Sequence, residues 1–134
     1  MQITREFAKY QLVPVAFAQA NVAASQTNVQ ILSDGVEGVS MPFAGEVLAI
    51  AVDTSAAASA GSLTVGVTKG GTENATTTQT LTTGTAAVKA FPRGTMTFVA
   101  GDKLGAEITT SADWDGTNAE LSVKVFVAFA VEGV

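Results

Sequence analysis

The 134-residue sequence contains no histidine and no cysteine. Most nucleophile–base pairs, soft-metal sites and redox centres in proteins are built from these two residue types. An enzyme made from this chain would therefore have to work with carboxylates, Lys, Tyr, Ser or Thr alone. The absence of cysteine also excludes a disulfide framework. These absences favour a structural or binding protein over a catalyst, and we expect neither a cofactor nor a metal.

Charged residues are also scarce, at 14% of the chain, where about a quarter is usual in soluble proteins. The 12 acidic and 7 basic residues give a net charge of -5 at pH 7. Such a surface repels phosphate groups, so neither nucleic acid nor a membrane is an expected partner. No stretch approaches the ~20 apolar residues that a membrane-spanning helix needs. A surface low in charge and rich in Ala and Thr favours assembly with neighbouring molecules.

Apolar residues alternate with a period of two in several segments, which is typical of half-buried β-strands. Leu63, Val65 and Val67 should share one face, and Val47 and Ala49 should lie opposite their neighbours Leu48 and Ile50. Turn residues such as Gly and Asp separate these segments. The predicted strands are residues 10–18, 29–32, 46–52, 63–68, 79–82, 95–99, 104–110 and 121–131. About eight strands at this spacing predict an all-β fold, an antiparallel β-sandwich in a single domain.

The last predicted strand changes character along its length. Up to Phe126 it is apolar on one face, and beyond Phe126 both faces are apolar. This pattern indicates a strand end that is buried by the core on one side and by a neighbouring molecule on the other. We therefore expect a homo-oligomer whose interface includes Phe126, Phe129 and Val131.

Two other segments have no clear period. Residues 54–61 are rich in Ser and Ala but too short to form a helix alone, so we expect a surface loop. Residues 72–78 are polar and short of apolar anchors, which predicts a mobile connector.

The segment Asp113-Trp114-Asp115-Gly116 is the best candidate for a chemical site. Its two carboxylates, with oxygens from Asn118 and Glu120, are of the type that binds Ca²⁺. However, a loop between strands needs Asp, Gly and Asn for its turn geometry alone. The side chain of Trp114 either stacks on a sugar or covers the core or an interface. Both alternatives stay open at this point.

Three stretches, residues 41–50, 61–71 and 98–110, share features with a known group of proteins. They contain a Pro-x-x-Gly strand opening, a Leu-Thr-Val-x-Val-x-Lys-Gly-Gly strand and turn, and a Phe-x-Ala-Gly-Asp-x-Leu corner. Over residues 41–131 the chain resembles the jelly-roll domains of tailed-bacteriophage virion proteins. Within that group it is most similar to capsid decoration (cement) proteins and to head or tail fibre domains.

The resemblance implies a homotrimer on the outer surface of a capsid, bound to the major capsid protein after synthesis in the host cytoplasm. The small size and the lack of a fibrous repeat favour decoration over a fibre role. The alternative is a carbohydrate- or receptor-binding jelly-roll module of a phage fibre or tail. A carboxylate enzyme ranks third.

Decoration proteins of this kind often reach over the shell with an N-terminal arm. In this chain the arm is residues 1–10, followed by a single jelly-roll domain over residues 11–134. The arm contains apolar side chains and two of the seven basic residues. We expect it to contact the capsid through Ile3, Arg5, Phe7, Lys9 and Tyr10.

Overall fold

The computed structural model describes residues 10–130, and almost every regular element in them is a β-strand. Eight strands have three or more residues: β1 (Tyr10–Gln19), β2 (Val29–Ser33), β5 (Gly45–Thr54), β6 (Leu63–Lys69), β8 (Gln79–Leu81), β9 (Ala86–Ala90), β11 (Lys103–Thr110) and β12 (Leu121–Ala130). Four two-residue strands add short pairings: β3 (Val36–Glu37), β4 (Val39–Ser40), β7 (Thr72–Glu73) and β10 (Thr97–Phe98). One 3-10 turn, η1 (Ala75–Thr77), follows β7.

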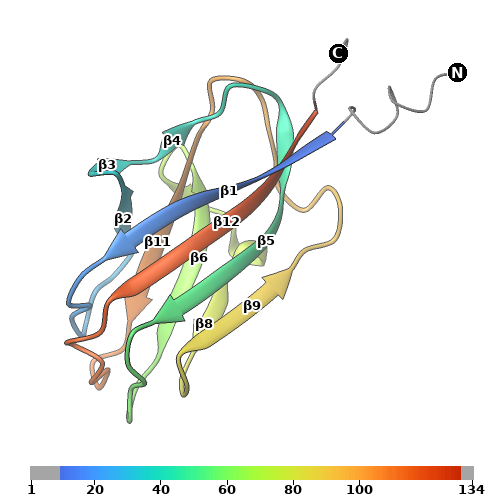
Figure 1. Ribbon diagram of the computed structural model, residues 1–134. Helices are drawn as coiled ribbons and strands as arrows, with labels where there is room; N and C mark the ends of the chain where they lie inside the picture. The colour runs from blue at the N-terminus through green and yellow to red at the C-terminus, as the bar shows by residue number, and fades with distance from the viewer. Residues whose placement is uncertain (1–9, 131–134) are drawn as a thin grey trace, which may run out of the picture.

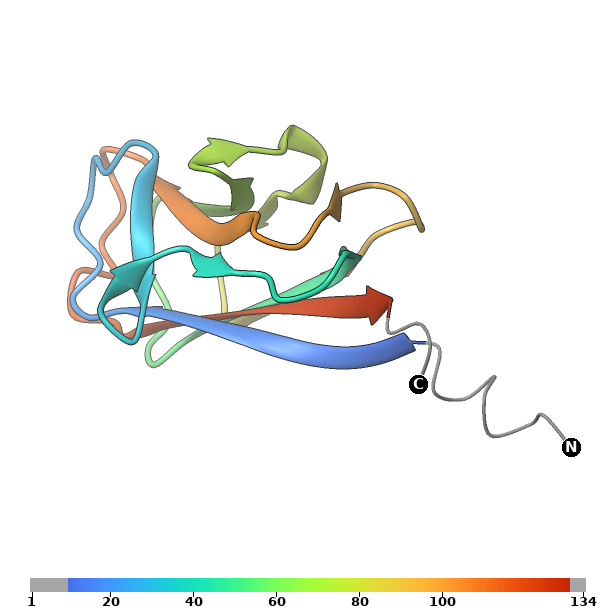
Figure 2. The ribbon, with the colours of Figure 1, turned by 90° about the horizontal axis from the view of Figure 1, so that it is seen from above.

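The eight longer strands form two antiparallel sheets that face each other (Figures 1 and 2). The front sheet has the order β9-β5-β12-β1, and the back sheet has the order β2-β11-β6-β8. The two sheets join at one edge, where Ala18 of β1 pairs with Leu32 of β2. This strand order is that of a jelly roll, a sandwich made of two Greek keys. The predicted all-β jelly-roll sandwich of about eight principal strands is therefore confirmed.

The hydrophobic core lies between the two sheets. The predicted inward residues of β6 are fully buried, as are the alternate valines of β12, Val123, Val125 and Val127. Trp114 closes one end of the core with only 3% of its surface exposed. Its indole Nε1 donates a hydrogen bond to the carbonyl oxygen of Val22 at 3.2 Å.

The predicted facing of residues 46–52 is wrong because β5 contains a β-bulge. Phe126 of β12 lies opposite Ala49, but the next residue, Val127, lies opposite Val47. Leu48 is therefore an extra residue, and an extra residue reverses the alternation of a strand. As a result Val47 and Ile50 are both buried, whereas strict alternation would have placed them on opposite faces.

Residues 72–78, predicted to be a mobile connector without apolar anchors, contain regular structure. The segment forms β7 and η1, and the side chain of Asn74 accepts a hydrogen bond from the backbone N–H of Thr76 at 3.0 Å. Thr77 is fully buried, and its Oγ1 accepts from the N–H of Val67 at 3.1 Å. A polar side chain thus anchors this turn to β6, which a search for apolar anchors does not detect. Residues 55–62, by contrast, contain no helix or strand, as predicted for the 54–61 loop.

The strand β9 was not predicted at all. Its sequence, Ala-Ala-Val-Lys-Ala, contains few β-branched residues and gives no clear alternation. It is held by pairing with β5 along its whole length, from Ala49–Ala90 to Asp53–Ala86. The predicted strand 95–99 is shortened to β10, although Met96 and Phe98 are buried and Thr97 and Val99 are exposed, as the alternation indicates.

Candidate assembly interface

The outer face of the front sheet is made almost entirely of small and apolar side chains. The pairing of β1, β12, β5 and β9 aligns these residues in rows across the four strands. One row is Pro14, Phe126, Ala49 and Ala90, the next is Ala16, Lys124, Ala51 and Val88, and a third is Ala18, Ser122, Asp53 and Ala86. We call these twelve residues the front face.

Six of the twelve front-face residues are alanine, so few side chains project far from the sheet. Its most exposed large hydrophobic residue is Val88 on β9, with 74% of its surface accessible, and Leu12 on β1, at the opposite edge of the sheet, is 68% accessible. Only Lys124 and Asp53 carry charge among the twelve residues. An apolar sheet face with so little charge is typical of a surface covered by another protein.

The front face ends at an ion pair between β5 and the turn after β9. Arg93 donates from Nη2 to Oε2 of Glu46 at 2.9 Å, and the N–H of Gly94 donates to Oε1 at 3.0 Å. These two hydrogen bonds hold the pKa of Glu46 below its usual value. They fix the turn at residues 92–94 against the sheet.

Two of the three residues predicted for the oligomer interface lie in the described part of the chain. Phe126 is half-buried in the middle of the front face, between Pro14 and Ala49. Phe129 points inward and is only 7% exposed, with its ring edge-on to Phe98 at a centroid distance of 6.0 Å. Phe126 therefore offers surface to a neighbour, while the ring of Phe129 is covered by its own chain. Val131 lies outside the described residues.

The predicted arm lies almost wholly outside the described residues as well. Ile3, Arg5, Phe7 and Lys9 precede residue 10. Tyr10 is the first residue of β1 and pairs with Ala130 of β12. The described part of the chain therefore begins at the end of the front sheet, with Tyr10 beside β12, the strand that was predicted to form the interface.

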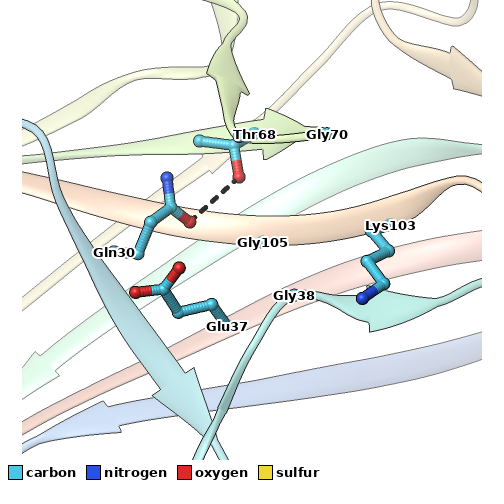
Figure 3. A pocket seen from close by; sticks show the side chains of 8 residues that line it. Gln30, Glu37, Gly38, Thr68, Gly70, Lys103 and Gly105 are labelled. Carbon is cyan, nitrogen blue, oxygen red and sulfur yellow. Dashed lines mark hydrogen bonds between the residues drawn. The ribbon is translucent and has the colours of Figure 1, made fainter.

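The outer face of the back sheet is polar instead. It carries a shallow groove of about 300 Å³, lined by Gln30, Thr68, Glu37 and Lys103 over a floor of glycines that includes Gly105. Figure 3 shows Thr68 donating to Oε1 of Gln30 across Gly105, at 3.4 Å. No aromatic side chain lines this groove.

Beside the groove, two glutamates approach each other. Glu107 is 5% exposed and accepts a hydrogen bond from Nε2 of Gln30 at 3.1 Å. Glu73 lies directly over Gly66, the β6 partner of Glu107, in space that a Cβ would fill. Burial raises the pKa of Glu107 above its usual value, and the neighbouring Glu73 raises it further, while the Gln30 hydrogen bond acts in the opposite direction. Sequence spacing gives no sign of this pair, because β7 was not predicted.

The Asp113–Asp115 segment uses its carboxylates to hold loops together. Oδ1 of Asp115 accepts hydrogen bonds from the N–H groups of Ser59 and Ala60 at 2.8 and 3.1 Å, and Oδ1 of Asp113 accepts from Oγ of Ser111 at 2.7 Å. Trp114 between them is buried, so the hypothesis that it stacks on a sugar is wrong and the alternative that it covers the core is confirmed.

Residues 10–130 contain no group of three or more acidic residues placed to hold a metal ion. They also contain no helix long and apolar enough to cross a membrane.

No family model matches the sequence, and no curated protein matches it. Among solved structures, the chain is similar to one in the capsid of cyanophage Pam1, with 14% identity, 91% of this chain and 84% of the other covered, and a TM-score of 0.48. It is also similar to the carbohydrate-binding module CBM36 in complex with calcium and xylotriose, with 19% identity, 87% and 97% covered, and a TM-score of 0.46. A third is in the capsid of Helicobacter pylori bacteriophage KHP30, with 12% identity, 91% and 94% covered, and a TM-score of 0.44. These likenesses are remote, and the jelly-roll assignment rests on the strand order given above.

Proposed function

We propose that this protein is a non-enzymatic virion structural protein that decorates and stabilises a bacteriophage capsid. In this proposal it binds the outer surface of the shell formed by the major capsid protein. The observation that carries the proposal is the front face: an alanine-rich surface across four strands, with one Lys and one Asp among its twelve residues. The jelly roll is a fold that viral capsid domains use repeatedly.

The polar chemistry of the described residues agrees with a structural role. The carboxylates described above make hydrogen bonds within the fold: Asp115 joins two loops, Glu46 holds a turn, and Asp113 bonds to Ser111 in its own loop. The sequence resemblance to phage virion domains, given above, points in the same direction. Together these observations favour binding over catalysis.

In the assembled state, the front face packs against neighbouring copies around Phe126, and a trimer is the state we propose. The arm of each copy, residues 1–10, contacts the capsid protein. Three arms on one trimer bind multivalently, so that weak single contacts combine into tight attachment.

The polar groove of the back sheet supports a second candidate, a carbohydrate- or receptor-binding module of a phage fibre or tail. Gln30, Thr68, Glu37 and Lys103 supply the hydrogen-bonding groups that a sugar requires. The groove lacks the aromatic platform on which sugars usually stack, which places this candidate second. Binding to a glycan array, lost on Gln30→Ala replacement, would favour it over decoration.

The test of the decoration proposal is sedimentation with undecorated capsids of the phage that encodes the chain. The full chain is expected to pellet with the capsids, and deletion of residues 2–9 should weaken binding by about 100-fold or more, because multivalent contacts are lost together. Circular dichroism checks that the shortened chain is still folded.

A matched pair of variants separates a specific arm contact from a general charge effect. Arg5→Ala with Lys9→Ala removes two positive charges from the arm, and Lys69→Ala with Lys103→Ala removes two exposed ones from the body. Only the first pair should weaken binding. If the full chain fails to bind capsids, the decoration proposal is wrong; if all variants bind equally, the arm is not the contact.

A further inference from the structure

The strand β1 has one open edge. On one side it pairs with β12 along its whole length, from Tyr10–Ala130 to Gln19–Leu121. On the other side it pairs only at Ala18, with Leu32 of β2. Along residues 11–17, therefore, the described part of the chain supplies no strand on this side of β1. An edge of this kind leaves backbone N–H and C=O groups ready to pair with another strand.

An apolar groove runs beside this open edge. It has a volume of about 400 Å³ and lies between β1 and the segment that contains β4. Its walls are residues 13–16 of β1 on one side and residues 33, 34 and 39–42 on the other, and Phe129 also contributes. The side chains are mainly apolar, and Asp34 is the one charged residue among them.

Exposed apolar side chains gather around the same groove. Six large hydrophobic residues in the described part of the chain are strongly exposed. Four of them adjoin wall residues in the sequence or pair with them: Leu12, Leu32, Val36 and Phe43. An open strand edge beside an apolar groove is the geometry of strand addition, in which backbone bonds give affinity and pockets hold alternate side chains.

Pro14 shows which kind of edge this is. Proline has no N–H to donate and is found in sheets only on edge strands or at bulges. A permanent place in the middle of the front sheet would therefore be poor for β1. Pro14 thus marks β1 as an edge strand, a position that suits an exchangeable segment.

The sequence itself contains a segment that fits. Residues 1–9 precede β1 and span up to about 30 Å when extended. They carry Ile3 and Phe7 for the apolar walls, and Arg5 and Lys9 to complement the charge of Asp34. The extended length is comparable to that of the ten-residue strand β1, and the arm's charge is opposite to that of Asp34.

The occupant is more favourably the arm of another copy than the chain's own arm. To reach its own groove, which begins at Val13, the arm would have to reverse direction just before Tyr10. Tight hairpins need Gly, Asn or Asp at the turn, and residues 7–9 are Phe-Ala-Lys. We propose that, in the free protein, residues 1–9 of one copy lie as an added strand along β1 in the groove of a second copy.

This arrangement goes beyond the decoration role, because it concerns the protein without a shell. Arm-to-groove contacts run head to tail, and such contacts form a ring when the rotation between copies closes and an open filament when it does not. A ring of three is compatible with the proposed trimer. One arm can bind either the groove or the capsid, but not both at once. The groove would therefore bind the arm until a capsid competes for it.

The lack of native cysteine makes a direct test simple. Two single variants are mixed: Thr4→Cys in the arm and Ser40→Cys in the groove wall. A disulfide between them can form only between different chains. With each protein at about 10 µM and a millimolar effective concentration in the complex, the mixed disulfide should form roughly 100-fold faster than a random one.

The control replaces Ser40→Cys with Thr83→Cys, which is exposed in the loop between β8 and β9. Fast crosslinking with Ser40→Cys and slow crosslinking with Thr83→Cys is the expected result. Equal rates for the two pairs would overturn the proposal. So would a disulfide that forms only inside one chain of a Thr4→Cys/Ser40→Cys double variant.

A pair of charge variants tests the same contact in a second way, through the rate of the same crosslink. Ser33→Arg places a positive charge in the groove wall, outside the front face, while Thr83→Arg adds the same charge in the exposed loop between β8 and β9. The first variant should crosslink at least tenfold more slowly through positions 4 and 40, and the second should not. No difference between them would contradict the proposal. Neither experiment uses capsids, so its failure would leave the decoration proposal standing.

Discussion

Replacing Phe129 with alanine should destabilise the fold strongly, although the sequence pattern assigned this residue to an interface. The ring is 7% exposed and makes edge-on contacts with Phe43 and Phe98, at centroid distances of 5.8 and 6.0 Å. Truncation of a buried Phe costs about 3–5 kcal/mol of unfolding free energy. The two aromatic contacts account for about 0.5–1.5 kcal/mol each. Phe129→Leu, which keeps most of the volume, should therefore lose only about 1–3 kcal/mol.

Urea unfolding followed by Trp114 fluorescence measures this effect. With a slope of roughly 1.5 kcal/mol per molar urea, Phe129→Ala should lower the midpoint by about 2–3 M. Phe126→Ala is the matched control, because Phe126 is half-buried on the outer face; we expect a loss of about 1–2 kcal/mol. All variants are compared at one protein concentration, since association adds to apparent stability. Equal losses at the two positions, or no loss at Phe129, would refute the assignment of Phe129 to the core.

Three further predictions concern polar groups. Glu107→Gln should raise the melting temperature at pH 7 and leave it unchanged at pH 3. Burial and the neighbouring Glu73 raise the pKa of Glu107 above 4.5 in the folded state. The contribution of Glu107 to stability is therefore fully present below pH 4.5 and is lost as the pH rises through the folded-state pKa. Glu46→Gln should lower stability by about 0.2–1 kcal/mol at pH 7, since its partner Arg93 is largely exposed. The effect of Glu46→Gln should disappear in acid, because the lowered pKa of Glu46 contributes stability above 4.5 that is lost as the pH falls through the native pKa. Thr77→Val should lower the free energy of unfolding, measured in urea, by about 1–3 kcal/mol, because the two hydrogen bonds of the buried hydroxyl are lost. Thr77→Ser should lower it less.

Each of these has a distinct opposite outcome. A melting temperature for Glu107→Gln that changes equally at both pH values would mean that the carboxylate pair is not the cause. A loss for Glu46→Gln that persists in acid would point to packing and not to charge. Equal stability of the Val and Ser variants of Thr77 would show that the hydroxyl is not an anchor.

Sequence periodicity predicted most of the fold because most strands have one buried face. Residues such as Val65 and Val123 alternate with polar neighbours, and both are fully buried. The predictions from periodicity were wrong where pairing with neighbouring strands determines the structure. The bulge at Leu48 depends on the register with β12, and β9 is an alanine-rich strand that is defined by its pairing with β5.

The candidate site was only partly predictable for the same reason. The change from one apolar face to two in β12 drew attention to Phe126, which is half-buried on the outer face; its place in an interface stays a prediction. Alanines such as Ala16, Ala49 and Ala90 carry little signal alone, and they become a surface only when pairing aligns them. The side chain of Phe129 points inward because the residue lies two positions after the buried Val127, on the same face of the strand. Apolar character alone does not tell which side a residue faces.

The most direct test of the account is the mass of the unmodified chain in solution, measured by sedimentation equilibrium from about 1 to 100 µM. If the front face and the β1 groove are covered by other copies, the mass should approach three times the chain mass of 13.6 kDa. Ala51→Glu, which places a charge in the middle of the front face, should shift the mass toward the single chain. A mass of 13.6 kDa for the unmodified chain at every concentration, unchanged by salt, would contradict the account.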